Sequence, residues 1–553
     1  INPKFKTVNF EKYKHGAIIV RPVYSLPERI NYANFKKVLD TALNIYLPIM
    51  TDYLSSKIIK NKNFLKLTEC LEFLHNPSDI QKISEYRRQM LFRNFYFFQF
   101  IIQSNRVTIT KLKCAAFDYG KAADKIKKLI NSLNFSLTKS QQKTFNEILN
   151  DISKDTPMRR LLQGDVGSGK TIIAILSTIV CVENNCQAVI MCPSELLAHQ
   201  HYNTFLKFLE FANYRICLLT SAISKKTREI LLEKISGGEI DIIIGTHSII
   251  QKDVNFYKVG LVVIDEQHRF GVKQRLLAVK HSTNPHLLYM TATPIPRTLG
   301  LTIFSDFDIS VISEKPRNRK KIITKIITEK EEEALFANIR KNAENGFQTF
   351  IVYPVIDESS KRELKSVKMR FEKLSNTVFK DINCAMLHSK INDEQRVNIM
   401  NDFVSNKIKI LFSTTIIEIG IDIPNANMMI IEHPECFGLA QLHQLRGRIG
   451  RNPIQSYCYL IISENLSTLS KQRIEKFTEL DDGLALAEFD LQNRGCGDFI
   501  GERQSGLSEN FIKDFFKHTD LMLEVKKIVF EILRNSDFKT KYLYLKKQMI
   551  FRK

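Results

Sequence analysis

A glycine-rich segment, GDVGSGKT, carries the most specific chemistry in this sequence. In such a segment the glycines let backbone N–H groups face phosphate oxygens, while Lys170 can reach the β- and γ-phosphates of a nucleotide. The Thr171 hydroxyl is a candidate ligand for Mg²⁺. We assign to this phosphate cradle Gly164, Asp165, Val166, Gly167, Ser168, Gly169, Lys170 and Thr171.

Two adjacent carboxylates could supply a further metal ligand and a general base, which the cradle lacks. Asp265 and Glu266 follow Leu261–Ile264, an apolar run that predicts a buried strand. At the end of such a strand Asp265 can hold Mg²⁺ and Glu266 can activate the attacking water. A strand-to-helix turn without a ligand would explain the glycines alone, but it would not explain the acidic pair as well. Together the two segments predict hydrolysis of a nucleoside triphosphate.

The composition indicates a globular protein of several domains with a polyanionic partner. A chain of 553 residues exceeds what one hydrophobic core usually supports, so we expect three or four domains. The net charge of +22 favours a polyanionic binding partner. A lysine-rich surface that results from a biased genome composition would give the same net charge. The ten cysteines include no Cys-x-x-Cys pair, which argues against a zinc site and for a reducing compartment.

No membrane segment is predicted, and the natural N-terminus is left open. The most apolar stretch, 95–102, is too short to span a bilayer, so we expect it to be the buried face of a helix. The first residue is Ile1 rather than Met, so a missing N-terminal part or a removed targeting segment stays open.

Short apolar runs alternate with amphipathic stretches in two successive regions of the chain. Continuous runs of this kind predict parallel strands whose sheet is covered by helices on both faces. The predicted strands are 188–192, 215–219, 240–244, 261–264 and 286–290 in the first region, and 349–353, 384–387, 409–412, 428–431 and 457–462 in the second. A polar, proline-containing hinge, 314–321, separates the two α/β domains.

The two ends of the chain lack this alternation of apolar runs and amphipathic stretches. Residues 34–49 and 85–103 have helical spacing of apolar residues, which predicts a helical bundle or arm before about residue 130. One strand is predicted at 16–22. Helices with a glycine-containing interruption at 494–497 are predicted after about residue 466.

An arginine-rich segment lies in the second α/β domain. Within Gln444–Arg451 two arginines, Arg448 and Arg451, lie three residues apart. From the start of a helix they can face the γ-phosphate held by the first domain, and an arginine supplied in this way is worth on the order of 10³–10⁵ in rate. A solvated basic helix end would explain the charges, but it would not explain the neighbouring glycines and Gln444.

The segment 413–422 follows another predicted strand. The hydroxyls of Thr414 and Thr415 can hold a nucleic-acid phosphate. Gly420 and Asp422 can approach the nucleotide. An ordinary loop explains this segment equally well when it is taken alone.

Two further signals are also weak when each stands alone. Thr291 and Thr293 end a predicted strand, where their small hydroxylated side chains can sense the state of the nucleotide. Before the glycine-rich segment, Phe135 can stack on adenine and the Gln141 amide can read the edge of the base. A helix N-terminus capped by Thr138 is the simpler explanation there.

In this order the segments resemble the motifs of the superfamily 2 helicases, and they are most similar to the RecG branch. Besides the glycine-rich cradle, the segments that carry the resemblance are Pro193–Ala198, Ile264–Val272, Met290–Leu299, Gly438–Arg448, Asp482–Arg494 and Gly501–Gly506. The last two resemble the translocation hairpin that RecG shares with the transcription-repair coupling factor. The resemblance extends over nearly the whole chain from about residue 17 and is most specific between 158 and 506.

The resemblance implies an α/β fold with two tandem RecA-like parallel-sheet P-loop domains. A helical region and the remnant of a β-barrel wedge would precede them, and a helical hairpin would follow. The expected segments are a remnant of the oligonucleotide-binding wedge, 1–25; a helical linker, 26–130; the helicase ATP-binding domain, 131–316; the helicase C-terminal domain, 317–465; and the translocation hairpin with C-terminal helices, 466–553.

The resemblance also implies a role for each matching residue. The residues implied for ATP hydrolysis are Lys170, Asp265, Glu266, Arg448 and Arg451, with Mg²⁺ held by Thr171 and Asp265. Those implied for adenine contact and for closing the nucleotide cleft are Phe135, Gln141, Gly420, Asp422 and Gln444. Those implied for coupling hydrolysis to movement are His268, Thr291, Thr293, Arg473, Arg494 and Gln504.

A RecG-like chain would be an ATP- and Mg²⁺-dependent translocase that remodels stalled replication forks and Holliday junctions. Its implied partners are branched or duplex DNA, with single-strand-binding protein as a further candidate, and RecG-like enzymes are generally monomeric and cytoplasmic. RecG proteins carry an N-terminal wedge that splits strands at a fork, but here only about residues 1–25 match its last portion. We therefore expect either a fragment or a reduced wedge, which leaves fork specificity open.

Four other functions are alternatives to a fork-remodelling RecG-like motor. Without a wedge, the chain would translocate along duplex DNA with no preference for forks. A transcription-repair coupling translocase shares the motor and hairpin, but the residues before 130 leave no room for its damage-recognition half. A DEAD-box RNA helicase fits poorly with the tetrad Asp265–His268 and with the hairpin. A remnant that binds DNA only through its charge conflicts with the complete set of catalytic residues.

Overall fold

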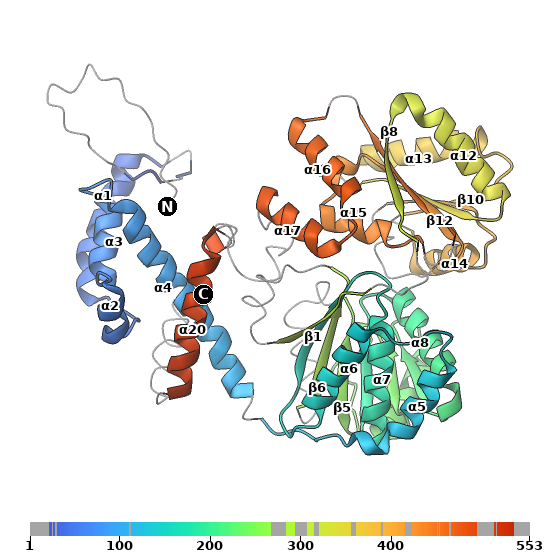
Figure 1. Ribbon diagram of the computed structural model, residues 1–553, viewed down its shortest axis with the longest axis horizontal. Helices are drawn as coiled ribbons and strands as arrows, with labels where there is room; N and C mark the ends of the chain where they lie inside the picture. The colour runs from blue at the N-terminus through green and yellow to red at the C-terminus, as the bar shows by residue number, and fades with distance from the viewer. Residues whose placement is uncertain are drawn as a thin grey trace. The chain divides into compact units, whose positions relative to one another are not determined.

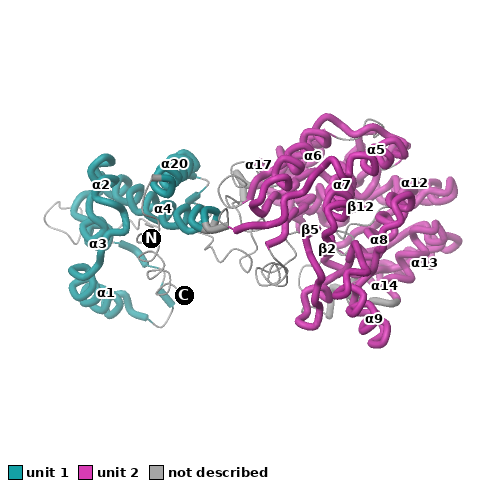
Figure 2. The backbone as a smooth tube through the Cα atoms, turned by 90° about the horizontal axis from the view of Figure 1, so that it is seen from below, with its two compact units in different colours: residues 1–107, 513–553 teal, residues 108–512 magenta. Residues whose placement is uncertain are grey.

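The computed structural model divides the chain into two compact units, which are described separately. Unit 1 consists of residues 1–107 and 513–553, and unit 2 consists of residues 108–512 (Figure 2). The residues that the structure describes are 22–24, 26–27, 30–109, 112–266, 284–293, 307–314, 320–354, 361–388, 391–414, 423–450, 452, 454–463, 466–494, 514–515 and 517–535.

A seven-stranded parallel sheet forms the first half of unit 2, with the strand order β3-β4-β2-β5-β6-β1-β7. Figure 1 labels β1, β5 and β6 of this sheet. Its strands are β1 (Arg159–Gly164), β2 (Gln187–Met191), β3 (Ile216–Leu219), β4 (Ile242–Gly245), β5 (Val259–Ile264), β6 (His286–Thr291) and β7 (Asp308–Ile312). Its helices are α5 (Ala123–Ser132), α6 (Lys139–Ile152), α7 (Lys170–Glu183), α8 (Glu195–Leu209) and α9 (Lys225–Ser236). Because the strands are parallel, the loops after β1, β5 and β6 meet at one edge.

A six-stranded parallel sheet forms the second half of unit 2, with the order β10-β11-β9-β12-β13-β8. Its strands are β8 (Ile323–Thr328), β9 (Gln348–Val352), β10 (Cys384–Leu387), β11 (Ile410–Ser413), β12 (Ala426–Glu432) and β13 (Tyr457–Ile462). Its helices are α12 (Glu332–Glu344), α13 (Lys361–Asn376), α14 (Asp393–Val404), α15 (Leu439–Arg446), α16 (Thr468–Glu479) and α17 (Gly483–Arg494). The short 3-10 helices of the chain are η2 (Leu47–Ile49), η3 (Tyr119–Lys121), η4 (Glu210–Ala212), η5 (His247–Ile250), η7 (Glu329–Glu331) and η9 (Pro434–Cys436).

These two sheets confirm the predicted fold class of two tandem parallel-sheet domains. Each strand that the apolar runs predict is present within one or two residues of its expected position. Three strands, β1, β7 and β8, were not among the predicted runs.

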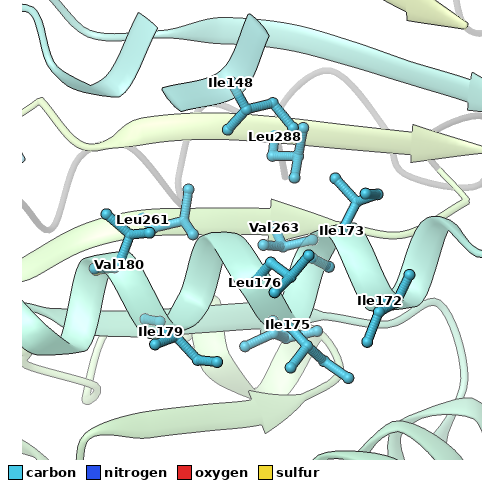
Figure 3. Close-up of a cluster of buried hydrophobic side chains, with 14 of the residues drawn as sticks. Ile148, Ile172, Ile173, Ile175, Leu176, Ile179, Val180, Leu261, Val263 and Leu288 are labelled. Atoms are coloured by element: carbon cyan, nitrogen blue, oxygen red, sulfur yellow. The ribbon is translucent and has the colours of Figure 1, made fainter. Parts of the chain in front are cut away.

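The helix after β1 is surrounded by apolar side chains (Figure 3). Every residue of α7 from Ile172 to Cys181 is buried. Figure 3 shows its side chains beside Ile148 of α6, Leu261 and Val263 of β5, and Leu288 of β6. Burying each such aliphatic side chain contributes roughly 1.5–3 kcal/mol to stability. This packing therefore fixes the position of the N-terminus of α7, where the preceding loop ends.

Unit 1 is helical in the part of the chain that the structure describes. Its helices are α1 (Tyr32–Tyr46), α2 (Ser56–Lys62), α3 (Leu67–His75), α4 (Ile83–Ile109) and α20 (Thr519–Asn535). The helices α1 and α4 occupy the two stretches with predicted helical spacing. Arg93 of α4 is fully buried, and its guanidinium donates to Asp52 Oδ2 (2.8 Å) and to the Leu65 carbonyl (2.6 Å).

The C-terminal helix α20 belongs to unit 1, so the predicted segment 466–553 is divided between the two units. The apolar residues Met522 and Val525 of α20 are completely buried. Gln103 of α4 donates to the Lys526 carbonyl (3.1 Å), so α20 completes the N-terminal bundle. The predicted strand 16–22 lies outside the described residues apart from its last residue. Among the helices in the described ranges, none is both long enough and apolar enough to cross a bilayer.

Candidate active site

The loop after β1 approaches its neighbours closely at two glycines. Gly164 lies so near Ser168 that an added Cβ would be 2.5 Å from the Ser168 Oγ. Gly169 has a φ of +87°, and a Cβ there would lie 2.3 Å from the Gln141 Nε2. A side chain at either glycine would meet these atoms, and at Gly169 it would also be strained by the positive φ. The N–H groups at the N-terminus of α7 can bind anions. The predicted cradle residues all lie in this loop and at the adjoining ends of β1 and α7.

Lys170 is the first residue of α7 and turns back over the loop. Its Nζ donates to the carbonyl oxygens of Gly164 (2.8 Å) and Asp165 (3.0 Å). Burial lowers the pKa of Lys170, while the negative charges of Glu266 and Asp265 act in the opposite direction. The lysine therefore lies within electrostatic reach of both predicted carboxylates.

Asp265 directly follows β5 and is buried. Its Oδ2 lies 2.8 Å from the His201 Nε2, and its Oδ1 accepts from the Glu266 N–H at 3.0 Å. Burial by itself raises the pKa of Asp265, but the hydrogen bond to His201 and the charges of His201 and Lys170 lower it overall. Asp265 is therefore held as a carboxylate, which is the form that binds a cation.

Glu266 has a different environment from that of its neighbour. Its φ is +50°, in the left-handed region that non-glycine residues rarely occupy, and such strain is often found at functional sites. Burial and the charge of Asp265 raise the pKa of Glu266, while Lys170 and Arg448 oppose this effect. Adjacent carboxyl groups whose pKa values move in opposite directions can divide cation binding and proton transfer between them.

The residues predicted to contact adenine lie at the N-terminus of α6. The Gln141 Oε1 accepts from the Thr138 N–H (2.9 Å), and its Nε2 donates to the Ser168 carbonyl (2.8 Å). Thr138 caps the helix in return. Gln141 therefore joins this helix cap to the glycine-rich loop. To hydrogen-bond adenine, its amide would have to give up one of these two hydrogen bonds. The Phe135 ring is 50% exposed.

The two threonines that end β6 are joined to each other. The Thr291 and Thr293 hydroxyls lie 2.6 Å apart, and the Thr291 Oγ1 also accepts from the Thr293 N–H at 3.1 Å. The intervening Ala292 N–H donates to the Glu266 Oε2 at 3.5 Å. This strand end therefore contacts the acidic pair directly.

Arg448 brings the second sheet into the site. It follows α15 and is only 3% exposed. Its charge lowers the pKa values of both Lys170 and Glu266, so its guanidinium lies within electrostatic reach of them. The approach is close, because a Cβ on Gly447 would lie 2.8 Å from the Val166 Cβ in the loop after β1.

Only some of the remaining predicted residues lie within the described ranges. Gln444 is buried in α15, and Thr414 is buried just after β11. Arg473 of α16 is buried with its Nε 3.4 Å from the Asp490 Oδ1 of α17. Arg494 is the last residue of α17. The predicted residues outside the described ranges are His268, Thr415, Gly420, Asp422, Arg451 and Gln504.

Comparison with known proteins identifies the family. The DEAD/DEAH box helicase family model matches residues 138–301, and that of the helicase conserved C-terminal domain matches residues 329–453. An ATP-dependent DNA helicase RecG from Aquifex aeolicus is 36% identical, over 100% of this chain and 71% of its own length. The chain belongs to the RecG family of ATP-dependent DNA helicases.

Other RecG proteins are also similar over most of this chain, and they are longer. The RecG protein of Synechocystis is 36% identical over 94% of this chain and 63% of its own length. A solved structure of RecG bound to a three-way DNA junction is 34% identical, with a TM-score of 0.71, and the match covers 90% of this chain and 66% of that one. The present chain therefore spans less than two thirds of these two RecG chains.

In this RecG-family chain, sequence reasoning missed the partner of Asp265. His201 lies on α8, three residues beyond the matching segment Pro193–Ala198, and is 6% exposed. A lone histidine on the buried face of a helix is most often part of the core, so its spacing carries no signal. Only its contact with Asp265 marks it as part of the site.

Proposed function

We propose that this RecG-family chain is an ATP-driven motor that moves along duplex DNA and remodels branched DNA. The proposed substrates are stalled replication forks, which it would reverse, and Holliday junctions, which it would migrate during recombination and repair. The observation that carries the proposal is the convergence of Lys170, Glu266 and Arg448 from two sheets. Hydrolysis at a site shared by two domains can drive their relative movement.

Each part of the site would have a distinct role toward ATP. Lys170 and the loop N–H groups would hold the phosphates, and Thr171 and Asp265 would hold Mg²⁺. Glu266 would accept the proton of the attacking water, and Arg448 would stabilise the charge that develops on the transferred phosphoryl group. Held by Thr171 and Asp265, Mg²⁺ would offset part of the negative charge of the phosphates.

The residues present fit a nucleotide with its metal ion. Asp265 is held as a carboxylate, and Thr171 adds a hydroxyl oxygen, so the donor set is the oxygen-rich one that Mg²⁺ prefers. The buried Ser168 Oγ has no hydrogen-bond partner among the described residues. The glycines of the loop keep its backbone clear of side chains, as close approach of phosphates requires.

The proposal also includes the remaining predicted contacts. Phe135 and Gln141 would contact adenine, and Thr414 and Thr415 would hold a DNA phosphate. The residues proposed to close the cleft or to complete the site are Gly420, Asp422, Gln444 and Arg451. Those proposed to couple hydrolysis to movement are His268, Thr291, Thr293, Arg473, Arg494 and Gln504.

We further propose that the chain acts as a cytoplasmic monomer, with single-strand-binding protein as a candidate partner. The net charge of +22 supports a DNA partner. The predicted domain limits at 25, 130, 316 and 465 remain part of the proposal.

Removal of the His201 side chain is expected to weaken Mg²⁺ binding. His201→Ala should raise the Mg²⁺ concentration needed for half-maximal tightening of ADP binding by about 10- to 100-fold, because losing the partner of a metal ligand typically costs that factor. Titration with a fluorescent ADP at increasing Mg²⁺ measures the shift. Affinity in EDTA should be unchanged, and the exposed His247 provides a control as His247→Ala. An unaltered Mg²⁺ requirement in His201→Ala would exclude this role.

The motor proposal is tested by ATP hydrolysis in the presence of four polymers. We expect forked DNA to stimulate hydrolysis by at least about fivefold, the lower range for coupling between sites, and to exceed linear duplex, single-stranded DNA and single-stranded RNA. Equal stimulation by both duplexes would favour the alternative, a translocase without fork preference. Strongest stimulation by RNA would contradict the proposal.

A further inference from the structure

His443 of α15 makes a hydrogen bond through each of its ring nitrogens. Its Nε2 lies 2.6 Å from the Asp165 Oδ1 in the loop after β1, and its Nδ1 lies 3.2 Å from the Arg446 Nη2. Arginine has no acceptor atom, so the Nδ1 must accept from Arg446 and the ring proton resides on Nε2. The buried histidine therefore donates to Asp165 and accepts from Arg446 at the same time.

Arg446 is fixed by the C-terminal end of α16. Its guanidinium donates to the carbonyl oxygens of Phe477 (3.0 Å) and Leu480 (2.8 Å). It also lies 4.3 Å from the centre of the Phe477 ring. Because Arg446 is only 3% exposed, any shift of this end of α16 must displace the guanidinium or break these bonds.

Asp165 is fixed in turn by the phosphate loop. The Oδ1 that accepts from His443 also accepts from the Val166 N–H at 2.8 Å. The Asp165 carbonyl accepts from the Lys170 Nζ at 3.0 Å. Hydrogen bonds therefore lead from the end of α16, through Arg446 and His443, to the Asp165 carboxylate, and the backbone carbonyl of the same residue bonds the lysine of the candidate ATP site.

The other end of α15 is also held by the helices that follow the second sheet. Asp490 of α17 accepts from the Leu439 N–H, at the first residue of α15, at 3.2 Å. The same carboxylate pairs with Arg473 of α16 at 3.4 Å, and both side chains are nearly fully buried. Movement of α16 and α17 must therefore be transmitted to α15.

We propose that His443 is a positioning residue that transmits movement between α16 and the ATP-binding loop. The inference rests on the proposed motor function and adds a route to it, from the Phe477 and Leu480 carbonyls through Arg446 and His443 to Asp165. A nucleotide that shifts the loop pulls on the Asp165 carboxylate and thereby on α16. Movement of α16 on DNA acts back on the loop, because coupling between two binding sites is reciprocal.

Two substitutions break this route at different points. His443→Gln places an amide N–H near the position of Nε2, so it keeps a donor for Asp165 and loses the acceptor for Arg446. His443→Asn places an amide oxygen near the position of Nδ1, so it keeps the acceptor and does not reach Asp165. If both bonds are needed, both variants lose the coupling.

Hydrogen–deuterium exchange of the full chain, with and without ADP and Mg²⁺, tests the route. In the unsubstituted chain we expect ADP to change exchange at residues 474–482. In both variants this change should shrink by at least about fivefold, the lower range for coupling between sites. Titration with fluorescent ADP sets the concentration that saturates each variant, so that exchange is compared at full ADP occupancy. The exposed His199 provides a control as His199→Gln, which should keep the full response.

The exchange measurement needs no DNA, so its outcome is separate from that of the motor proposal. A full ADP response at 474–482 in either variant overturns the role of His443. A missing response in the unsubstituted chain overturns it as well, whether or not DNA stimulates hydrolysis. A thermal unfolding midpoint equal to that of the unsubstituted chain shows that a lost response does not come from misfolding.

Discussion

ATP hydrolysis by a Lys170→Ala variant falls by on the order of a thousandfold, the upper range for removing one preorganised donor to charge in a transition state. The lysine lies in the glycine-rich loop and is within electrostatic reach of Asp265 and Glu266, so the substitution removes the positive charge from the loop itself. Phosphate release at saturating ATP, with and without forked DNA, measures the loss.

The control for this variant is Lys154→Ala, which removes an exposed lysine from the same domain and should leave the rate within about twofold, as expected for a surface change. Lys170→Met keeps the apolar stem of the side chain and separates loss of charge from loss of packing. Substantial hydrolysis by both Lys170 variants would show that the site has been assigned to the wrong residues.

Replacing Arg448 by Ala lowers kcat by about 10³-fold or more, the range measured for arginines supplied across a domain interface. Arg448 is buried, and its charge acts on both Lys170 and Glu266, although it follows α15 in the half of unit 2 that contains the second sheet. Since its contribution is greatest when charge develops on the transferred group, KM for ATP should change far less than kcat. Single-turnover hydrolysis and ADP binding measure the two effects separately.

A lysine at this position tests the geometry of the charge. Arg448→Lys retains the positive charge without the planar fork of donors, so it should recover only a small part of the rate. Arg340→Ala, at a partly exposed arginine of the same domain, serves as the matched control. A loss that appears mainly in KM would indicate that Arg448 binds the ground state and does not act in the transition state.

Most of the central strands are predictable because they are buried on both faces. Their sequences are continuous apolar runs, such as Val259–Ile264, and the structure has them where they are expected. The central strand β1 is an exception, since it begins with two arginines. The strands that escaped prediction include β7 and β8, which lie at the sheet edges. An edge strand is only partly covered, and in β8 Thr324 and Lys325 interrupt the apolar residues, so it lacks a continuous run.

The site is predictable from motif order, but its supporting contacts are not. The loop after β1, the acidic pair and Arg448 follow from motifs with stated chemistry. His201 and His443 belong to no spacing pattern that distinguishes them from core histidines. The roles proposed for them rest on contacts that only the fold creates, with carboxylates far along the chain at Asp265 and Asp165.

The pairing of α4 with α20 has a consequence for how the protein is made. Gln99 of α4 and Met522 of α20 are 423 residues apart in the sequence, yet their side chains are in contact. At 5–20 residues per second, the apolar side of α4 waits roughly 20–85 s after its own synthesis before its partner leaves the ribosome. During that time unit 2 can complete its fold, whereas the N-terminal bundle cannot. Unit 1 is thus the unit whose apolar surface stays uncovered longest while this chain is made.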